Sequence, residues 1–454
     1  MIRSRAGPLA IATAVLASGW TVACERVEIL LQSEPDLAPH ERYAASLATA
    51  GLEETALGRE WLAAAERALQ DPIGVESPYR ETSYLPADRP TSVGYALELE
   101  RGQSLEVRVE VEADPSPQIF LDIFRRVRGA QGDPPEYRLL ASADSGSLSM
   151  AFEPARDGEY LLRLQPELLR SARYTLTLTA GGALAFPVEG GSTRDVGSGF
   201  GAPREGGRRE HQGVDIFASR GTPVLAVVDG RVSRVRDRGL GGKYIWVRDS
   251  RRGLSLYHAH LDAQLVREGE TVRIGDTLGL VGNSGNARTT PPHLHFGVYA
   301  RGEGPIDPLP FIVRRNRRPP ELTIALQNLE SRLRLRQAAT LRAGPGAAAE
   351  SIRELEAGTL LDAVGGAGDW YRIELPDRSQ GYVLAALVEP ADRPIESHEV
   401  DVSAPVLETP RYGATPVADL VAGDRLEVLG RFDGFLFARS EGGVEGWLLA
   451  VADE

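Results

Sequence analysis

Apolar and polar residues alternate with a period of two over much of the chain beyond residue 90. The alternating runs lie at 97–111, 119–123, 160–164 and 174–178, and turn-forming segments such as "ADPSP" and "ARDGE" separate them. A period of two is typical of half-buried β-strands. Several such strands joined by turns predict a small β-sandwich over 89–181, which we expect to be a stabilising or spacing module.

The chain before this region has a helical pattern. Residues 25–88 are rich in Ala, Leu and Glu, and Leu47, Leu57 and Trp61 recur at roughly helical spacing. The pattern predicts a helical spacer or a small helical hairpin, and no candidate catalytic motif stands in it.

Strand-like runs return between 184 and 312, where glycines interrupt them. Runs such as "TPVLAVVDGRV", "KYIWVRD" and "LSLYHAHL" are rich in β-branched and aromatic residues. They predict a compact antiparallel β fold with tight turns. A Gly/Pro-rich boundary precedes this unit, and a basic, proline-containing linker at 313–330 follows it.

An internal repeat with an offset of 65 residues occupies the C-terminal part of the chain. The pair Gly-Tyr at 381–382 returns as Gly-Trp at 446–447, and similar matches flank it. Two copies of one unit, at 331–392 and 399–454, are the simplest explanation. Each copy is expected to consist of short strands with an aromatic residue near a turn.

The first copy resembles bacterial SH3-like domains over "TLRAGPGAAAESIRELEAGTLLDAVGGAGDWYRIELPDRSQGYV". The second copy is more divergent and lacks the R-x-G-P turn. The resemblance implies two small SH3-like barrels that bind cell-wall material. Trp370, Tyr371 and Tyr382 are candidates for the lining of a ligand groove, and equally for the core of so small a barrel.

The N-terminus has the layout of a secretory signal. Residues 1–24 contain two arginines, an apolar Ala-rich run and small residues before Cys24. Cys24 is the only cysteine, so it cannot form an intramolecular disulfide. Its place resembles that of the lipidated cysteine of bacterial lipoproteins, although Thr21 stands where that family's signal usually has Leu. The alternative is cleavage after Ala23, which leaves a free thiol. We expect export to the cell envelope (periplasm) and a membrane lipid anchor at Cys24.

Charge and histidine content narrow the function. The formal net charge of −13 argues against nucleic acid as a partner, because nucleic-acid binding calls for a basic footprint. Histidine is the commonest metal ligand, so clustered histidines suggest a metal site. Five of the seven histidines lie between 211 and 295: His211, His258, His260, His293 and His295. Strand alternation would place each of the pairs 258/260 and 293/295 on one face.

Five sequence blocks in this region follow a recognisable order. They are H-x-G-x-D from His211 to Asp215, then "DGRV", "YHAHL", "GDTLGLVGNSG" and "PPHLHF". The order resembles the lysostaphin/LytM-type zinc metalloendopeptidases of bacterial cell walls, over about 184–312. The resemblance implies an antiparallel β fold that holds one Zn²⁺ ion and hydrolyses peptide cross-bridges of peptidoglycan.

The resemblance also implies a role for individual residues. His211, Asp215 and His295 correspond to the metal ligands, and His260 and His293 to the two catalytic histidines that do not bind the metal. Three protein ligands leave one tetrahedral position for water, as in catalytic zinc sites. His260 and His293 could accept or donate a proton or stabilise an oxyanion, and the sequence does not divide these roles. His258 is expected to be a bystander or a substrate contact.

The predicted fold is therefore mainly β and multidomain. A short helical region and a β-sandwich precede the LytM-type domain, and two small SH3-like barrels follow it. Two functions are compatible with the resemblance: a peptidoglycan endopeptidase, or a catalytically inactive LytM-type activator of a cell-wall amidase. Inactive relatives usually lose a ligand, and all five positions are filled here, which favours the enzyme. The bond cut is expected to be D-Ala–diaminopimelate if the envelope has two membranes.

Overall fold

The computed structural model describes residues 37–127, 135–314 and 318–450. The signal sequence and Cys24 lie outside these ranges. The described part is mainly antiparallel β, which confirms the predicted fold class, and its α-helices are α2 (Pro39–Thr49), α3 (Ala56–Gln70) and α4 (Leu309–Ile312). None of the described helices is long and apolar enough to cross a bilayer.

Two facing sheets share one core and form the sandwich. One sheet has the order β1-β3-β8-β5-β6, and the other contains the order β2-β9-β4-β7. The bounds are β1 Ile73–Gly74, β2 Tyr79–Leu85, β3 Val93–Leu99, β4 Gln103–Glu112, β5 Ile119–Val127, β6 Glu136–Ser142, β7 Ser149–Phe152, β8 Gly158–Pro166 and β9 Ala172–Gly182. Along β4, buried and exposed residues alternate as predicted, because only one face of this strand meets the core.

Helices α2 and α3 are not a spacer, because they cover the outer face of the first sheet. The buried indole of Trp61 donates a hydrogen bond to the carbonyl of Pro166 at 2.8 Å, and the ring of His40 stacks on it. Phe120, on the outer face of β5, is buried beneath the helices. The expectation of helix through residue 88 was wrong for 73–85, which form β1 and β2. Helix formation stops near Pro72, and the aromatic and β-branched residues of β2 favour a strand.

The unit that follows the sandwich is built on a ten-stranded sheet of its own. We call this sheet the cleft sheet. Its central order is β10-β13-β20-β17-β16-β15-β18. The bounds are β10 Val196–Ser198, β13 Val214–Phe217, β14 Pro223–Leu225, β15 Gly230–Asp237, β16 Lys243–Asp249, β17 Leu254–Gln264, β18 Thr271–Val272, β19 Thr277–Val281, β20 His293–Ala300 and β21 Gly304–Ile306. A short hairpin of β11 (Pro203–Arg204) and β12 (Arg209–Glu210) extends from it. One face packs on the apolar core, and residues of the other face line a cleft.

The two C-terminal copies repeat strand by strand. Copy 1 contains β22 Arg332–Leu335, β23 Ala339–Arg342, β24 Ser351–Leu355, β25 Leu360–Ala367, β26 Trp370–Glu374, β27 Gln380–Leu384 and β28 Val388–Pro390. Copy 2 contains β29 Glu396–Glu399, β30 Ala404–Leu407, β31 Pro416–Leu420, β32 Arg425–Phe432, β33 Phe435–Ser440 and β34 Glu445–Leu449. Strands β30 to β34 each begin 65 residues after their counterparts β23 to β27. The offset read from the sequence is therefore an offset between equivalent strands.

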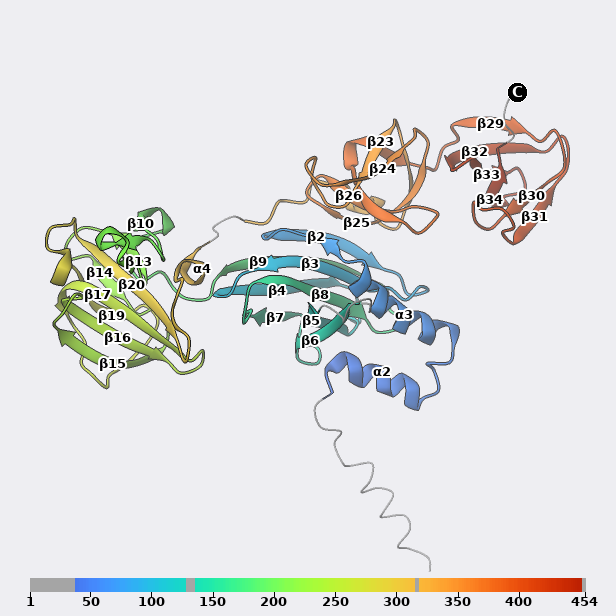
Figure 1. The fold of residues 1–454 in the computed structure, drawn as a ribbon. Coiled ribbons are helices and arrows are strands. Elements are labelled where there is room, and N and C mark those ends of the chain that lie inside the picture. The colour runs from blue at the N-terminus through green and yellow to red at the C-terminus, as the bar shows by residue number, and fades with distance from the viewer. Residues whose placement is uncertain (1–36, 128–134, 315–317, 451–454) are drawn as a thin grey trace, which may run out of the picture.

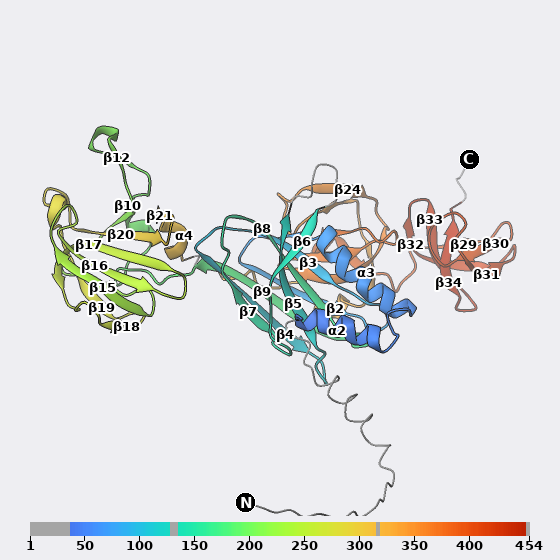
Figure 2. The same ribbon diagram turned by 60° about the horizontal axis from the view of Figure 1, so that its bottom comes forward.

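Copy 1 is joined to the sandwich by a continuous sheet. Strand β25 pairs with β2 through Gly366 and Gly365, so that the second sheet of the sandwich runs on into copy 1 (Figure 1). A Cβ atom at Gly365 would lie 2.6 Å from the Glu81 carboxylate, so glycine is required for this approach. Figures 1 and 2 show the cleft sheet at one end of the sandwich and copy 2 at the other.

A buried ion pair lies at this junction. The guanidinium of Arg372 is 2.7 Å from the carboxylate of Glu81, and it also donates to the hydroxyl of Ser83 at 2.8 Å. The hydroxyls of Tyr79 and Tyr382 are 2.9 Å apart beside it. Tyr382 and Tyr371 are buried in the core, so they do not line a ligand groove, and only Trp370 keeps partial exposure.

We predict that Arg372→Met lowers the free energy of unfolding of the sandwich and copy 1 by about 3–5 kcal/mol, because it leaves the charge of the buried Glu81 carboxylate without a counter-charge. The measurement is urea denaturation followed by circular dichroism. Glu81→Gln added to Arg372→Met should restore most of the loss, because no charge then remains buried. Arg439→Met, which breaks the exposed pair with Glu445, is the matched control and should change little. Equal effects of Arg372→Met and the control would contradict the prediction.

Candidate metal centre and active site

The pairing of β13 with β20 places the first two candidate ligands side by side. Asp215 and His295 lie directly opposite each other in this antiparallel pair, and their side chains share one face of the sheet. His211 comes from the loop before β13. Gly213 stands between His211 and Asp215 in the sequence, and a Cβ atom there would come within 2.9 Å of the His295 imidazole. The glycine of the H-x-G-x-D block therefore leaves room for the ring of His295.

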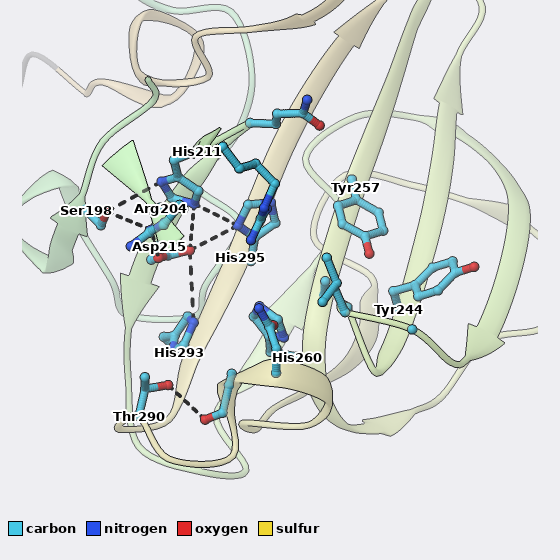
Figure 3. A pocket seen from close by; sticks show the side chains of 18 of the residues that line it. Ser198, Arg204, His211, Asp215, Tyr244, Tyr257, His260, Thr290, His293 and His295 are labelled. Carbon is cyan, nitrogen blue, oxygen red and sulfur yellow. Dashed lines mark hydrogen bonds and ion pairs between the residues drawn. The ribbon is translucent and has the colours of Figure 1, made fainter. Parts of the chain in front are cut away.

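Three ligand atoms converge at this point (Figure 3). The Nε2 atom of His211 is 2.9 Å from Nδ1 of His295, and both nitrogens are 3.0 Å from Oδ1 of Asp215. Burial alone would raise the pKa of Asp215, but its contacts with the two imidazoles hold that pKa well below its usual range. Burial lowers the pKa of His295. The cluster therefore combines a carboxylate with imidazole nitrogens.

The tautomer of His211 is set by a backbone carbonyl. Its Nδ1–H donates to the carbonyl of Gly199 at 2.8 Å, which leaves Nε2 with a lone pair that faces the cluster. A carbonyl acceptor behind a histidine is the usual arrangement around metal ligands in proteins. Two nitrogens and one carboxylate oxygen in mutual contact are the donor set that Zn²⁺ prefers. The described residues thus fit a metal ion held by His211, Asp215 and His295.

Arg204 supports Asp215 from behind, and no motif in the sequence pointed to it. Its guanidinium lies 2.6 Å from Oδ2 of Asp215 and 2.9 Å from the hydroxyl of Ser198. Oδ2 is thereby occupied, and Oδ1 is left facing the two imidazoles. The only signal in the sequence was the presence of several arginines just before His211. In the structure this segment forms the β11–β12 hairpin, which places Arg204 beside Asp215.

His260 and His293 lie beside the three ligand residues. Their ring centroids are 5.0 Å apart, and Nε2 of His293 is 4.0 Å from Oδ1 of Asp215. Each ring donates from Nδ1 to a backbone carbonyl, His260 to Ser284 at 2.9 Å and His293 to Pro291 at 2.8 Å. Nε2 of each ring is therefore a proton acceptor. Burial, with the neighbouring histidines, lowers the pKa of His260 to about 4.

His258 and His260 do not share a face, contrary to the alternation expected for "YHAH". His260 has a positive φ of 64°, and the register of β17 against β16 shifts between His258 and Leu261. This bulge turns His260 into the cleft and leaves His258 fully buried beneath it, 5.2 Å from the ring of Phe296. Burial lowers the pKa of His258 to about 4. His258 is a core residue and makes no contact with the cleft.

An open cleft of about 730 Å³ surrounds the cluster. Figure 3 shows Tyr257 and Tyr244 beyond His260, on the side away from Arg204 and Ser198. Four aromatic side chains of the cleft sheet line this side: Tyr244, Trp246, Tyr257 and Tyr299. The ring of Tyr257 meets His295 edge-on at 5.8 Å, so the aromatic surface begins at the metal ligands. The cleft can therefore hold an extended ligand next to the cluster.

Comparison with known proteins agrees with this geometry. Residues 209–308 match the model described as "Peptidase family M23". An L-Ala--D-Glu endopeptidase of Bacillus subtilis (strain 168) is 37% identical over 142 residues, which cover 29% of this chain and 43% of the relative. The peptidoglycan DD-endopeptidase ShyC of Vibrio cholerae is 37% identical over 100 residues, which cover 22% of each chain. The chain thus spans less than half of the length of these curated relatives.

Structural and C-terminal matches complete the comparison. The catalytic domain of lysostaphin from Staphylococcus simulans is 31% identical and covers 25% of this chain and 89% of its own, with a TM-score of 0.24. Residues 337–389 match the model described as "Bacterial SH3 domain", which lies within copy 1. The region that holds His211, Asp215, His260, His293 and His295 is a peptidase family M23 domain, of the LytM type, and a bacterial SH3 domain follows it in the same chain.

Proposed function

We propose that this chain is a zinc-dependent endopeptidase that hydrolyses peptide cross-links of peptidoglycan. The observation that carries the proposal is the convergence of His211, Asp215 and His295, with the proton-accepting Nε2 atoms of His260 and His293 beside them. Two relatives are named as an L-Ala--D-Glu endopeptidase and a peptidoglycan DD-endopeptidase, which supports a peptide of peptidoglycan as the substrate.

In this proposal His211, Asp215 and His295 hold one Zn²⁺ ion. A bound zinc ion lowers the pKa of water to about 7 and polarises a carbonyl group. The fixed tautomer of His211 and the contact of Arg204 with Asp215 orient two of the three ligands toward their shared point.

His260 and His293 move the protons of the reaction. In each ring Nδ1 is bonded to a backbone carbonyl, so Nε2 of either ring can accept the proton of the attacking water as the bond to the carbonyl carbon forms. The same proton can then pass to the leaving amine as the C–N bond breaks. The second imidazole would have to carry a proton on Nε2 as well, as an imidazolium, to stabilise charge on the carbonyl oxygen.

We further infer that the protein works in the cell envelope. The substrate lies outside the cytoplasm, and the first 24 residues have the pattern of an export signal. A lipid at Cys24 would hold the protein at a membrane, and the SH3-like copies would hold it on the wall. Because Tyr371 and Tyr382 are buried, the copies would use other surfaces for this contact.

We predict that His211→Ala and His293→Ala separate metal binding from hydrolysis. His211→Ala removes one of three ligands, so the purified protein should lose its zinc. His293→Ala keeps the ligands and should retain about one zinc, but hydrolysis of isolated sacculi should fall by about 10²–10⁴-fold. The measurements are metal analysis and mass spectrometry of the released peptides, which also identifies the bond that is cut.

The amidase-activator hypothesis makes the opposite prediction for the wild type. Zinc-loaded wild-type protein would cut no sacculus preparation, but would stimulate a separate amidase. That result would rule out the endopeptidase function.

We predict that Arg204→Gln weakens zinc binding by about 10–100-fold, because Asp215 loses the partner of its Oδ2 atom. The measurement is competition with a fluorescent zinc chelator. Arg209→Gln is the matched control, because Arg209 lies in the same hairpin but pairs with the exposed Glu205. Equal zinc affinity of the two variants would show that Arg204 has no role in holding Asp215.

We predict that metabolic labelling with a fatty-acid analogue marks the wild-type protein and not Cys24→Ala, because no other cysteine is present. The labelled protein should fractionate with membranes. Label that persists in Cys24→Ala, or that is absent from wild type, would exclude the lipid anchor.

A further inference from the structure

The cleft carries a local positive charge in an acidic protein. The whole chain has a formal net charge of −13. The charged side chains that line the cleft, apart from histidines, are nonetheless four arginines and one carboxylate: Arg204, Arg209, Arg234, Arg238 and Asp215. A concave site lined by one sign of charge attracts ligands of the opposite sign. The cleft is therefore suited to an anionic ligand.

The four arginines differ in whether they already have partners. Arg204 is paired with Asp215 and Arg209 with Glu205. Arg234 and Arg238 make no salt bridge with any described residue, whereas Arg236, between them in β15, pairs with Glu268 outside the cleft. Two guanidinium groups that lack an ion-pair partner among the described residues are thus available at the cleft.

Cross-strand register connects Arg234 to the active site. Arg234 on β15 lies opposite Trp246 on β16, and Trp246 lies opposite Tyr257 on β17. The ring centroids of Trp246 and Tyr257 are 4.6 Å apart. On the next strand, β20, Gly297 lies opposite Tyr257, and the ring of Tyr257 meets the ring of His295 edge-on at 5.8 Å. This row of side chains runs across the sheet from the cluster to Arg234.

Arg238 is held in the same region by the turn that follows β15. Its backbone N–H donates to the carbonyl of Gly242, and the N–H of His260 donates to the carbonyl of Gly241 at 2.9 Å. The turn that positions Arg238 is therefore tied to the backbone of a catalytic candidate. Both free arginines have fixed attachment points relative to the site.

The row also sets a length scale. Three interstrand steps of about 4.8 Å separate β20 from β15, which corresponds to roughly four residues of extended peptide. An arginine side chain reaches back over part of that span. A carboxylate bound by Arg234 or Arg238 would belong to a residue about two to four positions from the scissile bond.

We propose that Arg234 and Arg238 are specificity residues that bind a free carboxylate of the substrate peptide, while Trp246 and Tyr257 support the peptide between that carboxylate and the scissile bond. Arginine suits this role because its planar fork matches a carboxylate in two parallel hydrogen bonds. The inference deepens the proposed endopeptidase function and rests on it for the choice of peptide. A cleft that binds an uncharged peptide would have no use for these two arginines.

The test compares two forms of one cross-linked peptide dimer. In one form the carboxyl groups of diaminopimelate and D-isoglutamate are free, and in the other they are amides. Binding is measured by isothermal titration at low salt with chelator-treated full-length protein, so that no hydrolysis interferes. Wild type should bind the free form at least about tenfold more tightly, and Arg234→Gln/Arg238→Gln should lose this preference. The preference should shrink in 0.5 M salt.

Arg236→Gln is the matched control, because Arg236 lies on the same strand but does not line the cleft. It should keep the preference. Equal binding of both peptide forms by wild type would overturn the proposal, as would an equal loss in the control or an equal loss of both forms in the double variant. A poly(glycerol phosphate) probe that alone loses affinity in the double variant would assign the arginines to a phosphate polymer and would also overturn it.

Failure of this inference is distinguishable from failure of the proposed function. Sacculi that are cut by a protein with no carboxylate preference would contradict only the role of the arginines. A carboxylate preference in a protein that never cuts sacculi would contradict only the endopeptidase function.

Discussion

The pairing of Asp215 with His295 across β13 and β20 is the constraint on which the site depends. Two nitrogens and one oxygen lie within 3.0 Å of one another, and the register of this strand pair brings two of the three residues together. A slip of one residue in this pair would turn His295 into the core and bring Leu294 or Phe296 to the cleft. Those two buried residues prevent the slip, because their exposure would cost several kcal/mol of hydrophobic stabilisation, at about 1.5–3 kcal/mol for each side chain.

The two H-x-H pairs place their histidines differently. On β20 the regular alternation suffices, so His293 and His295 both face the cluster. On β17 the alternation is interrupted, and the positive φ of His260 re-aims its ring while His258 remains in the core. Bulges next to active sites commonly serve this purpose. The strain at His260 is offset by the hydrogen bonds of its backbone N–H to Gly241 and of its ring to Ser284.

Local pattern and motif order predicted much of this molecule. The period of two identified most of the strands, and the 65-residue offset identified equivalent strands of the two copies. The order of the sequence blocks predicted that His211, Asp215 and His295 belong to one site, and their ligand atoms lie close together in the structure. Contacts between distant segments could not be predicted from the sequence, because no local pattern encodes them. Arg372 and Glu81 are 291 positions apart, and the contact of Arg204 with Asp215 depends on how the β11–β12 hairpin folds.

These distant contacts decide how the modules are joined. The stretch 313–330 was predicted to be a basic, proline-containing linker, and its residues from 323 onward are fastened to copy 1. Thr323 donates to the carbonyl of Gly368, and Tyr371 donates to the carbonyl of Ala325. At the other joint, Arg252 binds Glu153 of the sandwich together with Asp249 of the cleft sheet. The Arg252–Glu153 pair is partly exposed and contributes little to stability by itself. At the junction with copy 1, by contrast, separation would break a continuous sheet and leave a buried charge without its counter-charge. This junction therefore fixes copy 1 to the sandwich.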